Sequence, residues 1–522
     1  MDPHVVAAAR AAFAGDAPSL VLGAPVHAGA CLPEPLVRLP LALVTRHGLI
    51  AGATGTGKTK TLQLLAEQLS AAGVPVFLAD VKGDLSGLAA PGEASERVSR
   101  RAADTGWDWR PAACPVELLS LSGARGAQLR ATVSSFGPLL LAKALGLNDT
   151  QTSVLTLVVR YCDDRALELL DLGDLRAVLQ FLSTEGAADL QAYGGMSKQT
   201  VGVLLRKLVE LEQQGGAAVF GEPEFDLADL LRLAPDGRGI VSVLELADVQ
   251  DEPALFSTVM MWMLARLYAT LPEIGDVERP KLVFFFDEAH RLFAGASPAF
   301  LEQVEQVVRL VRSKGVGVFF VTQSPKDLPA SVLGQLGNRV QHALRAFTED
   351  DARALRAAAR TIPRTPHYDV EQTLTSLAIG EALVSVLSPS GVPTPPFATR
   401  LLPPSSRMAP LTDAELQNRL AASAQVRRYA AAVDRESAEE KLAARGAAGG
   451  EAATRGDDAG ADASGDRGDR PSGRGGTRAA GGTFEAILRS PVTRSVAVTV
   501  AGAVTRTLMG ALLGRPSRRR RS

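Results

Sequence analysis

The glycine spacing at residues 52–59 limits what this chain can fold into more than any other feature. The segment reads Gly-Ala-Thr-Gly-Thr-Gly-Lys-Thr. Apolar residues from Leu43 to Ala51 predict a strand before it, and apolar spacing on one face of Thr59 to Leu69 predicts a helix after it. In such a strand, turn and helix, backbone N–H groups converge on a phosphate at the helix N-terminus. The sequence therefore predicts a phosphate-binding loop rather than a chance glycine turn.

The residue types in this loop predict that it binds ATP together with Mg²⁺. The Lys58 ammonium would reach the β- and γ-phosphate oxygens, and the Thr59 hydroxyl would ligate Mg²⁺. Backbone N–H groups would hold the remaining phosphate oxygens. The predicted nucleotide contacts are Gly52, Ala53, Thr54, Gly55, Thr56, Gly57, Lys58, Thr59 and Lys60.

Two adjacent acids follow a second apolar run. Residues 281–286, Lys-Leu-Val-Phe-Phe-Phe, predict a buried strand, and Asp287 and Glu288 come directly after it. The carboxyl end of a parallel strand faces the crevice in which ligands of α/β sheets bind. We therefore expect Asp287 to hold Mg²⁺ and Glu288 to act as the general base on the attacking water. His290 either senses the γ-phosphate or caps the strand.

A third apolar run, Val316 to Thr322, predicts a strand beside the acidic one. Gln323 follows it and could hydrogen-bond both the γ-phosphate and the attacking water. The alternative is an ordinary turn amide before Pro325. An arginine finger from a neighbouring subunit would stabilise charge in the transition state. Its candidates are Arg312, Arg339 and Arg345, which the sequence does not rank.

A further predicted strand, Val74 to Asp80, would bring two more candidate site residues to the same crevice. Asp80 would face the nucleotide, and Lys82 would contact phosphate, a neighbouring subunit or DNA. Ordinary turn chemistry explains both residues equally well.

The pattern of the whole chain predicts an α/β fold with a mostly parallel sheet flanked by helices. Near-continuous apolar strands alternate with helical stretches, as expected when both faces of a sheet are covered. The segment from about 128 to 215 has helical spacing and predicts a helical insertion in an ATPase domain that spans residues 1–405. The expected strands are Leu41 to Ala51, Val74 to Asp80, Val116 to Leu121, Ile240 to Leu246, Leu282 to Asp287, Val316 to Thr322 and Ala382 to Leu387.

The C-terminal part predicts three further segments. Residues 406–445 are polar and predict a helical extension, and residues 446–482 contain too few apolar side chains to fold, which predicts a disordered linker. Residues 483–522 predict an amphipathic helix with a basic end at 518–521 and no uncharged run of membrane-spanning length. Three scattered cysteines and an N-terminus without a secretory pattern predict a cytoplasmic protein.

Taken together, these motifs resemble the bacterial HerA-like helicase C-terminal family within the HerA/FtsK superfamily. The resemblance spans about residues 20–402 and rests on segments 46–59, 80–87, 286–290 and 312–323. It implies a RecA-like P-loop NTPase core, ring hexamers with ATP between subunits, and ATP-driven movement of DNA through the pore. It assigns the nucleotide-site roles to Lys58, Thr59, Asp287, Glu288 and Gln323.

The resemblance has one departure, and a second function stays open beside it. Archaeal HerA proteins carry a β-barrel before the core and work with a nuclease, whereas 51 residues precede Gly52 here, so a nuclease partner does not follow. The tetrapeptide at 287–290 also occurs in the helicases named for it, but no second motor domain follows. The alternative to a DNA translocase is a motor that acts on protein at the membrane surface, docked through the basic tail. The formal net charge of −1 favours neither.

Overall fold

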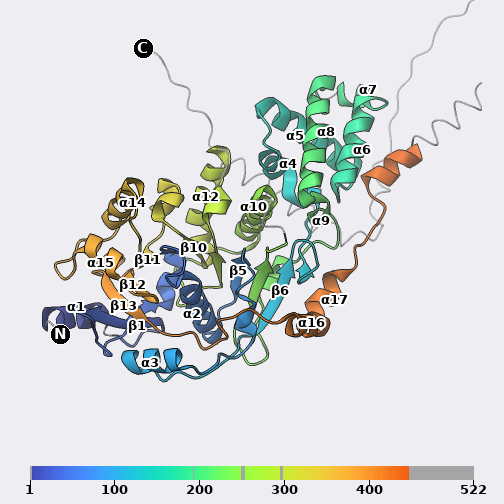
Figure 1. Ribbon diagram of the computed structural model, residues 1–522. Helices are drawn as coiled ribbons and strands as arrows, with labels where there is room; N and C mark the ends of the chain where they lie inside the picture. Colours follow the sequence, from blue (N-terminus) through green and yellow to red (C-terminus); the bar gives the residue numbers. More distant parts are fainter. Residues whose placement is uncertain (1–2, 14, 192, 249–252, 294–297, 446–522) are drawn as a thin grey trace, which may run out of the picture.

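Figure 1 shows a computed structural model of the chain, which describes residues 3–445 apart from 14, 192, 249–252 and 294–297. A large sheet forms the centre, helices lie on both of its faces, and one group of helices stands beyond the sheet. This arrangement confirms the predicted α/β class with a mostly parallel sheet. The predicted linker (446–482) and the predicted basic tail (483–522) lie outside the described residues.

The parallel part of the sheet carries the predicted motifs. Every residue of β4, β5, β8, β9 and β10 is buried, as expected for apolar strands covered on both faces. Because these strands run in the same direction, the residues that follow them meet at one edge, here called the carboxyl edge. Across the sheet the order is β11 (Asn338–His342), β4 (Gly48–Ala51), β10 (Val316–Thr322), β9 (Leu282–Phe286), β5 (Val76–Asp80), β8 (Val241–Glu245), β6 (Val116–Ser120) and β7 (Ala127–Gln128).

An antiparallel group continues the sheet beyond β11. β12 pairs with both β11 and β13, and β13 pairs with β1. The apolar pattern predicted only β12 of this group. In β1, a Cβ on Gly23 would lie 2.1 Å from the Arg400 carbonyl oxygen. Glycine is required there because β1 and β13 approach closely, although glycine is a poor strand former. The strands are β12 (Glu381–Ser385), β13 (Phe397–Leu401), β1 (Ser19–His27), β2 (Ala30–Cys31) and β3 (Val37–Pro40).

Two hydrophobic cores lie on the two faces of the sheet. Successive residues of β9 alternate between them: Phe285 packs in one core with α2 (Lys58–Ala71), and Phe284 and Phe286 pack in the other with α10 (Pro253–Thr270) and α12 (Pro298–Val311). The helix that follows the phosphate loop is therefore fixed on one face, and the helix between β9 and β10 on the other. Further helices are α1 (Pro3–Phe13), α3 (Glu96–Thr105), α11 (His290–Phe293), α13 (Ala330–Leu333), α14 (Glu349–Arg360) and α15 (Val370–Ser376).

The group of helices beyond the sheet occupies most of the segment predicted as an insertion. Side chains at the ends of these helices satisfy free backbone groups, and Asn148 and Asp171 each form a capping box. Within the described residues, none of the helices has the length and apolar content needed to cross a membrane. The group contains α4 (Val133–Ala144), α5 (Asp149–Arg165), α6 (Leu172–Ser183), α7 (Ala187–Gln191), α8 (Lys198–Leu211) and α9 (Ala217–Val219).

One predicted strand is wrong over half of its length. Residues Leu41–Arg46 form a 3₁₀ helix, and the strand begins only at Gly48. Between them, His47 adopts a positive φ of 60°, which breaks the extended backbone. Leu41, Leu43 and Val44 are buried all the same. An apolar run in the sequence predicts burial well, but it does not distinguish a strand from a short helix.

The segment from 403 to 445, here called the strap, runs along the outside of the fold from α2 to the insertion. It contains α16 (Asp413–Ala422), α17 (Ala424–Ala430) and a helical segment at 438–445. At its start, Ser405 and Ser406 donate backbone N–H groups to the Glu67 carboxylate on α2, at 2.8–3.0 Å. The strap therefore contacts the helix that follows the phosphate loop.

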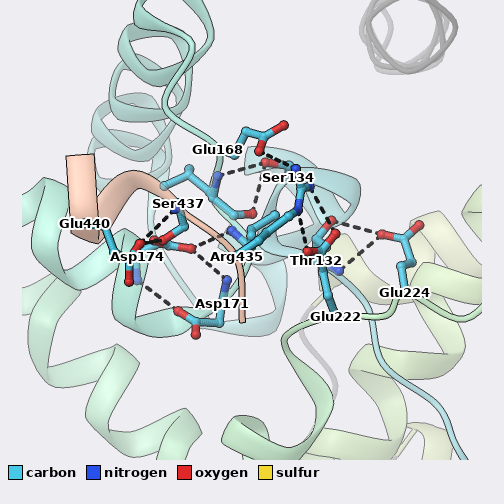
Figure 2. A network of polar contacts seen from close by, with 12 residues as sticks. Thr132, Ser134, Glu168, Asp171, Asp174, Glu222, Glu224, Arg435, Ser437 and Glu440 are labelled. Atoms are coloured by element: carbon cyan, nitrogen blue, oxygen red, sulfur yellow. Dashed lines mark hydrogen bonds and ion pairs between the residues drawn. The ribbon is translucent and has the colours of Figure 1, made fainter. Parts of the chain in front are cut away.

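The far end of the strap is anchored to the insertion by charged groups (Figure 2). Arg435 donates to Glu222 at 2.6 and 3.0 Å and to Glu168 at 2.7 Å. Ser437 donates to Asp174 on α6, which also accepts the backbone N–H of Glu439 at 3.0 Å. These charge-assisted bonds connect the far end of the strap to α6 and to the segments that carry Glu168 and Glu222.

Candidate active site

The glycine-rich loop joins β4 to α2 at the carboxyl edge. Gly52, Gly55 and Gly57 have positive φ values of 154°, 78° and 113°, which side-chain-bearing residues rarely adopt. At Gly52 a Cβ would lie 2.4 Å from the Cβ of His342, so no larger residue fits there. Gly57 caps the N-terminus of α2. The loop thus presents backbone N–H groups around a helix N-terminus, as the predicted phosphate site requires.

The Lys58 side chain folds back over this loop. Its ammonium donates to the carbonyl oxygens of Gly52 at 2.8 Å and Ala53 at 3.2 Å. Burial lowers the pKa of Lys58, and the nearby Glu288 carboxylate opposes that shift. The ammonium therefore lies at the loop with weak carbonyl partners, which phosphate oxygens can replace.

Two residues that follow Lys58 differ in their surroundings. Thr59 is half-buried in the first turn of α2. The Lys60 ammonium instead contacts the Met408 carbonyl oxygen in the strap. A nucleotide contact by Lys60 would therefore come from its backbone N–H and not from its side chain.

The acid pair lies at the same edge, two strands away from the loop. β10 separates β4 from β9, with Thr322 beside Ala51 and Phe320 beside Phe286. Both Asp287 and Glu288 are buried, at 1% and 5% exposure. Their charges raise the pKa of Lys58 against the effect of burial, and the strand order brings the loop and the acids to the same edge.

Asp287 has one carboxylate oxygen ready for a ligand. Its Oδ1 accepts the Glu288 backbone N–H at 2.9 Å, while its buried Oδ2 has no hydrogen-bond partner within the described residues. Burial, and then repulsion by Glu288, raise the pKa of Asp287 to about 7. A buried oxygen without a partner fits a Mg²⁺ ligand or a ligand of Mg²⁺-bound water, with Thr59 on the loop as the second protein group. No cluster of three metal-binding side chains occurs in the described part of the chain, so phosphate oxygens would complete the coordination.

Glu288 contacts two basic side chains. Its Oε1 forms an ion pair with the Lys82 ammonium, and its Oε2 lies 3.3 Å from the His290 Nδ1. Burial alone would raise the pKa of Glu288, but the Lys82 ammonium outweighs burial and the net shift is downward. Glu288 also has a positive φ of 46°, an uncommon conformation that turns the chain sharply after β9.

Gln323 follows β10 and is exposed beside this site. The turn that carries it is held by Asp327, which accepts the Thr322 hydroxyl at 2.9 Å and the Ser324 backbone N–H at 2.8 Å. The amide is thus available to a ligand between the loop and the acids, as the predicted sensor role requires.

The predicted finger arginines all contact other parts of their own chain. Arg312 precedes β10, at the edge opposite Gln323, and lies 3.3 Å from Asp276. Arg339 donates to the carbonyl oxygens of Thr361 and Leu333, at 3.0 and 3.2 Å. Arg345 donates to the Thr375 carbonyl oxygen at 3.2 Å. An arginine finger from this set would have to act on a neighbouring subunit.

Two residues support the site in ways that the motifs did not single out: Asp80, for which the sequence left a turn role open, and His342, which it did not indicate. Asp80 accepts the backbone N–H groups of Lys82, Gly83 and Leu85, at 3.2, 2.8 and 2.8 Å, so it shapes the loop after β5. His342, which the motifs did not indicate, is fully buried behind Gly52, and its Nε2 lies 2.9 Å from the Thr61 hydroxyl. Burial lowers its pKa to about 3, so the imidazole is neutral. β11 reads Asn-Arg-Val-Gln-His, and nothing in this pattern singles out His342.

The state of Asp287 predicts a pH-dependent gain of stability on substitution. Its pKa is about 7 in the fold against 3.8 for an ordinary aspartate, so the fold loses stability as pH rises through 7 and the buried group ionises. Asp287→Asn imitates the neutral acid. In protein free of nucleotide and Mg²⁺, we expect it to raise the free energy of unfolding by on the order of 3 kcal/mol more at pH 8 than at pH 5, because the loss runs from the ordinary pKa to the raised one. Thermal unfolding at the two pH values measures this.

A matched control uses Asp276, whose side chain is 75% exposed. Asp276→Asn removes a carboxylate from the surface and leaves the buried site intact, so it should not reproduce the larger gain at pH 8. An Asp287→Asn protein that is equally or less stable at pH 8 would contradict the assignment of a raised pKa.

One protein family and several solved structures are similar to this chain. The sequence profile described as "Helicase HerA-like C-terminal" matches residues 29–520. No curated protein sequence matches the chain.

Among solved structures, the plasmid coupling protein TrwB with a non-hydrolysable ATP analogue is 15% identical, with a TM-score of 0.49 over 76% of this chain and 99% of that one. TrwB with ADP and Mg²⁺ is 15% identical, with a TM-score of 0.48 over 75% and 96%. VirB4 of Thermoanaerobacter pseudethanolicus is 14% identical, with a TM-score of 0.45 over 74% and 97%.

Proposed function

Because the chain belongs to the HerA-like helicase C-terminal family, we propose that it is a motor ATPase that forms a ring hexamer and uses ATP hydrolysis to move DNA. A P-loop ATPase of the HerA/FtsK type is the activity that the family supports. One observation supports placing ATP hydrolysis at this site. The Lys58 ammonium and the Asp287 and Glu288 carboxylates lie at one carboxyl edge, close enough for their charges to interact.

Each group in the site has a role in ATP hydrolysis that follows from its position. The glycine loop binds the phosphates through backbone N–H groups, and Lys58 leaves its carbonyl partners for the phosphate oxygens. Asp287 and Thr59 would hold Mg²⁺, which supplies charge neutralisation when bound. Glu288 takes the proton of the attacking water, and the Gln323 amide orients that water.

A ring would give each site access to an arginine of a neighbouring subunit. In some P-loop NTPases a guanidinium stabilises the transition-state charge, and within one chain Arg312, Arg339 and Arg345 contact other groups. A neighbouring subunit in a closed ring would present the missing arginine at each site. The DNA and hexamer parts of the proposal also rest on the family relationship.

The decisive experiment measures ATP turnover with and without double- and single-stranded DNA. We expect DNA to raise the rate at low salt and the effect to fade as salt increases, because binding to phosphates releases counterions. Light scattering on the same samples should show a mass near six chains when ATP is present. If the protein is a monomer and DNA does not change its ATP turnover at low salt, the translocase proposal is wrong and only the ATPase activity stands.

A further inference from the structure

The strongest contact at the proposed general base is its ion pair with Lys82. The Lys82 ammonium contacts Oε1 of Glu288, and the His290 imidazole lies 3.3 Å from Oε2. The ammonium therefore holds Oε1, whereas Oε2 and the His290 Nδ1 are buried without a hydrogen-bond partner within the described residues. A cation bonded to a carboxylate favours its ionised form, so the ion pair makes Glu288 a weaker base for the water proton.

The chain around Lys82 is built to keep the ammonium in this place. β5 pairs with β9, so the loop after β5 lies next to the acids. The Asp80 carboxylate holds that loop through three backbone N–H groups, and Gly83 turns it with a positive φ of 73°. These bonds hold the backbone at Lys82, and its side chain extends to Glu288.

The two partners of the ion pair differ in their exposure. The Lys82 side chain is 45% exposed, whereas that of Glu288 is 7% exposed. A polyanion in solution can therefore reach the ammonium without entering the buried part of the site. A phosphate oxygen that binds Lys82 competes directly with Glu288 for the same cation.

From these observations we propose that Lys82 is a latch on Glu288. In the resting protein the ion pair holds one oxygen of the carboxylate, weakens Glu288 as a base and so keeps ATP turnover low. When a phosphate oxygen of bound nucleic acid takes the ammonium, Glu288 is released to the attacking water. Lys82 is a positioning residue, since it acts through Glu288, and the proposal rests on Glu288 being the general base.

The basal rate of a Lys82→Met protein tests the latch. Methionine keeps the apolar stem and removes the charge, so without DNA we expect kcat for ATP to rise about fivefold, with KM nearly unchanged. Lys82→Arg restores a cation and should keep the low basal rate. A loop damaged by the substitution would lower kcat, so a fall or no change in the basal rate of a folded Lys82→Met protein overturns the proposal.

Two further arms locate the effect. The double variant Lys82→Met, Glu288→Gln should be as inactive as Glu288→Gln alone, because the gain acts through the carboxylate; a surviving gain would overturn the proposal. DNA should stimulate Lys82→Met by a much smaller factor than the wild type, and equal factors would overturn release by nucleic acid. If DNA stimulates neither protein, the proposed translocase fails, while the basal rates still decide the latch.

Discussion

Affinity for Mg²⁺·ATP falls by about 100-fold when Lys58 is replaced by alanine, because the charge-assisted bonds from the ammonium to the phosphate oxygens are lost. The ammonium already lies at the loop, bonded to the carbonyl oxygens of Gly52 and Ala53. The wild-type protein therefore needs little rearrangement to bind phosphate, and the variant loses the cation that already lies at the loop. Titration with a fluorescent ATP analogue measures the change.

The neighbouring lysine provides a control of the same chemistry. The Lys60 ammonium contacts the Met408 carbonyl oxygen in the strap rather than the loop. Lys60→Ala should therefore bind ATP within a fewfold of the wild type. If Lys60→Ala lost affinity as strongly as Lys58→Ala, a general loss of positive charge, and not the loop geometry, would explain binding.

The second large effect concerns turnover and leaves binding intact. Glu288→Gln keeps the size of the side chain and removes the basic oxygen, so we expect kcat to fall by about 10²- to 10⁴-fold while ATP still binds. Single-turnover hydrolysis and analogue binding on the same preparation separate the two quantities. A variant with normal turnover would show that another group takes the proton from water.

A second buried glutamate at the same edge of the sheet gives a matched control. Glu245 ends β8, is fully buried and lies 3.5 Å from Arg125, two strands away from Glu288 across the sheet. Glu245→Gln changes the same atoms in a similar burial, yet it should retain turnover. Loss of turnover in both variants would indicate a requirement for negative charge at the carboxyl edge rather than for one base.

The arrangement of the motifs was predictable because it depends on short-range patterns and on one property of parallel sheets. Strands that run in one direction bring their carboxyl ends to a common edge whatever their lateral order. The acids after β9, Gln323 after β10 and the loop after β4 could therefore be assigned to one site without knowing which strand neighbours which.

Other features required contacts between residues that are distant in the chain. The Lys82 ammonium could have bound phosphate, a neighbour or DNA, and only the pairing of β5 with β9 placed it on Glu288. His342 had no motif, since its role comes from lying behind Gly52. The sequence left Arg312 as one of three candidates for an arginine finger. The direction of β10 places it at the edge of the sheet opposite Gln323, where it contacts Asp276.

By itself, the sequence determined that the chain carries a phosphate loop, an acid pair at a strand end and an α/β sheet, because glycine conformations and apolar periodicity act locally. The tertiary structure decided that β10 lies between the loop and the acids. It also decided that Lys82 forms an ion pair with Glu288, and that the strap contacts both α2 and the insertion. These depend on strand order and on long-range side-chain pairing, which many sequences with the same local pattern could satisfy differently.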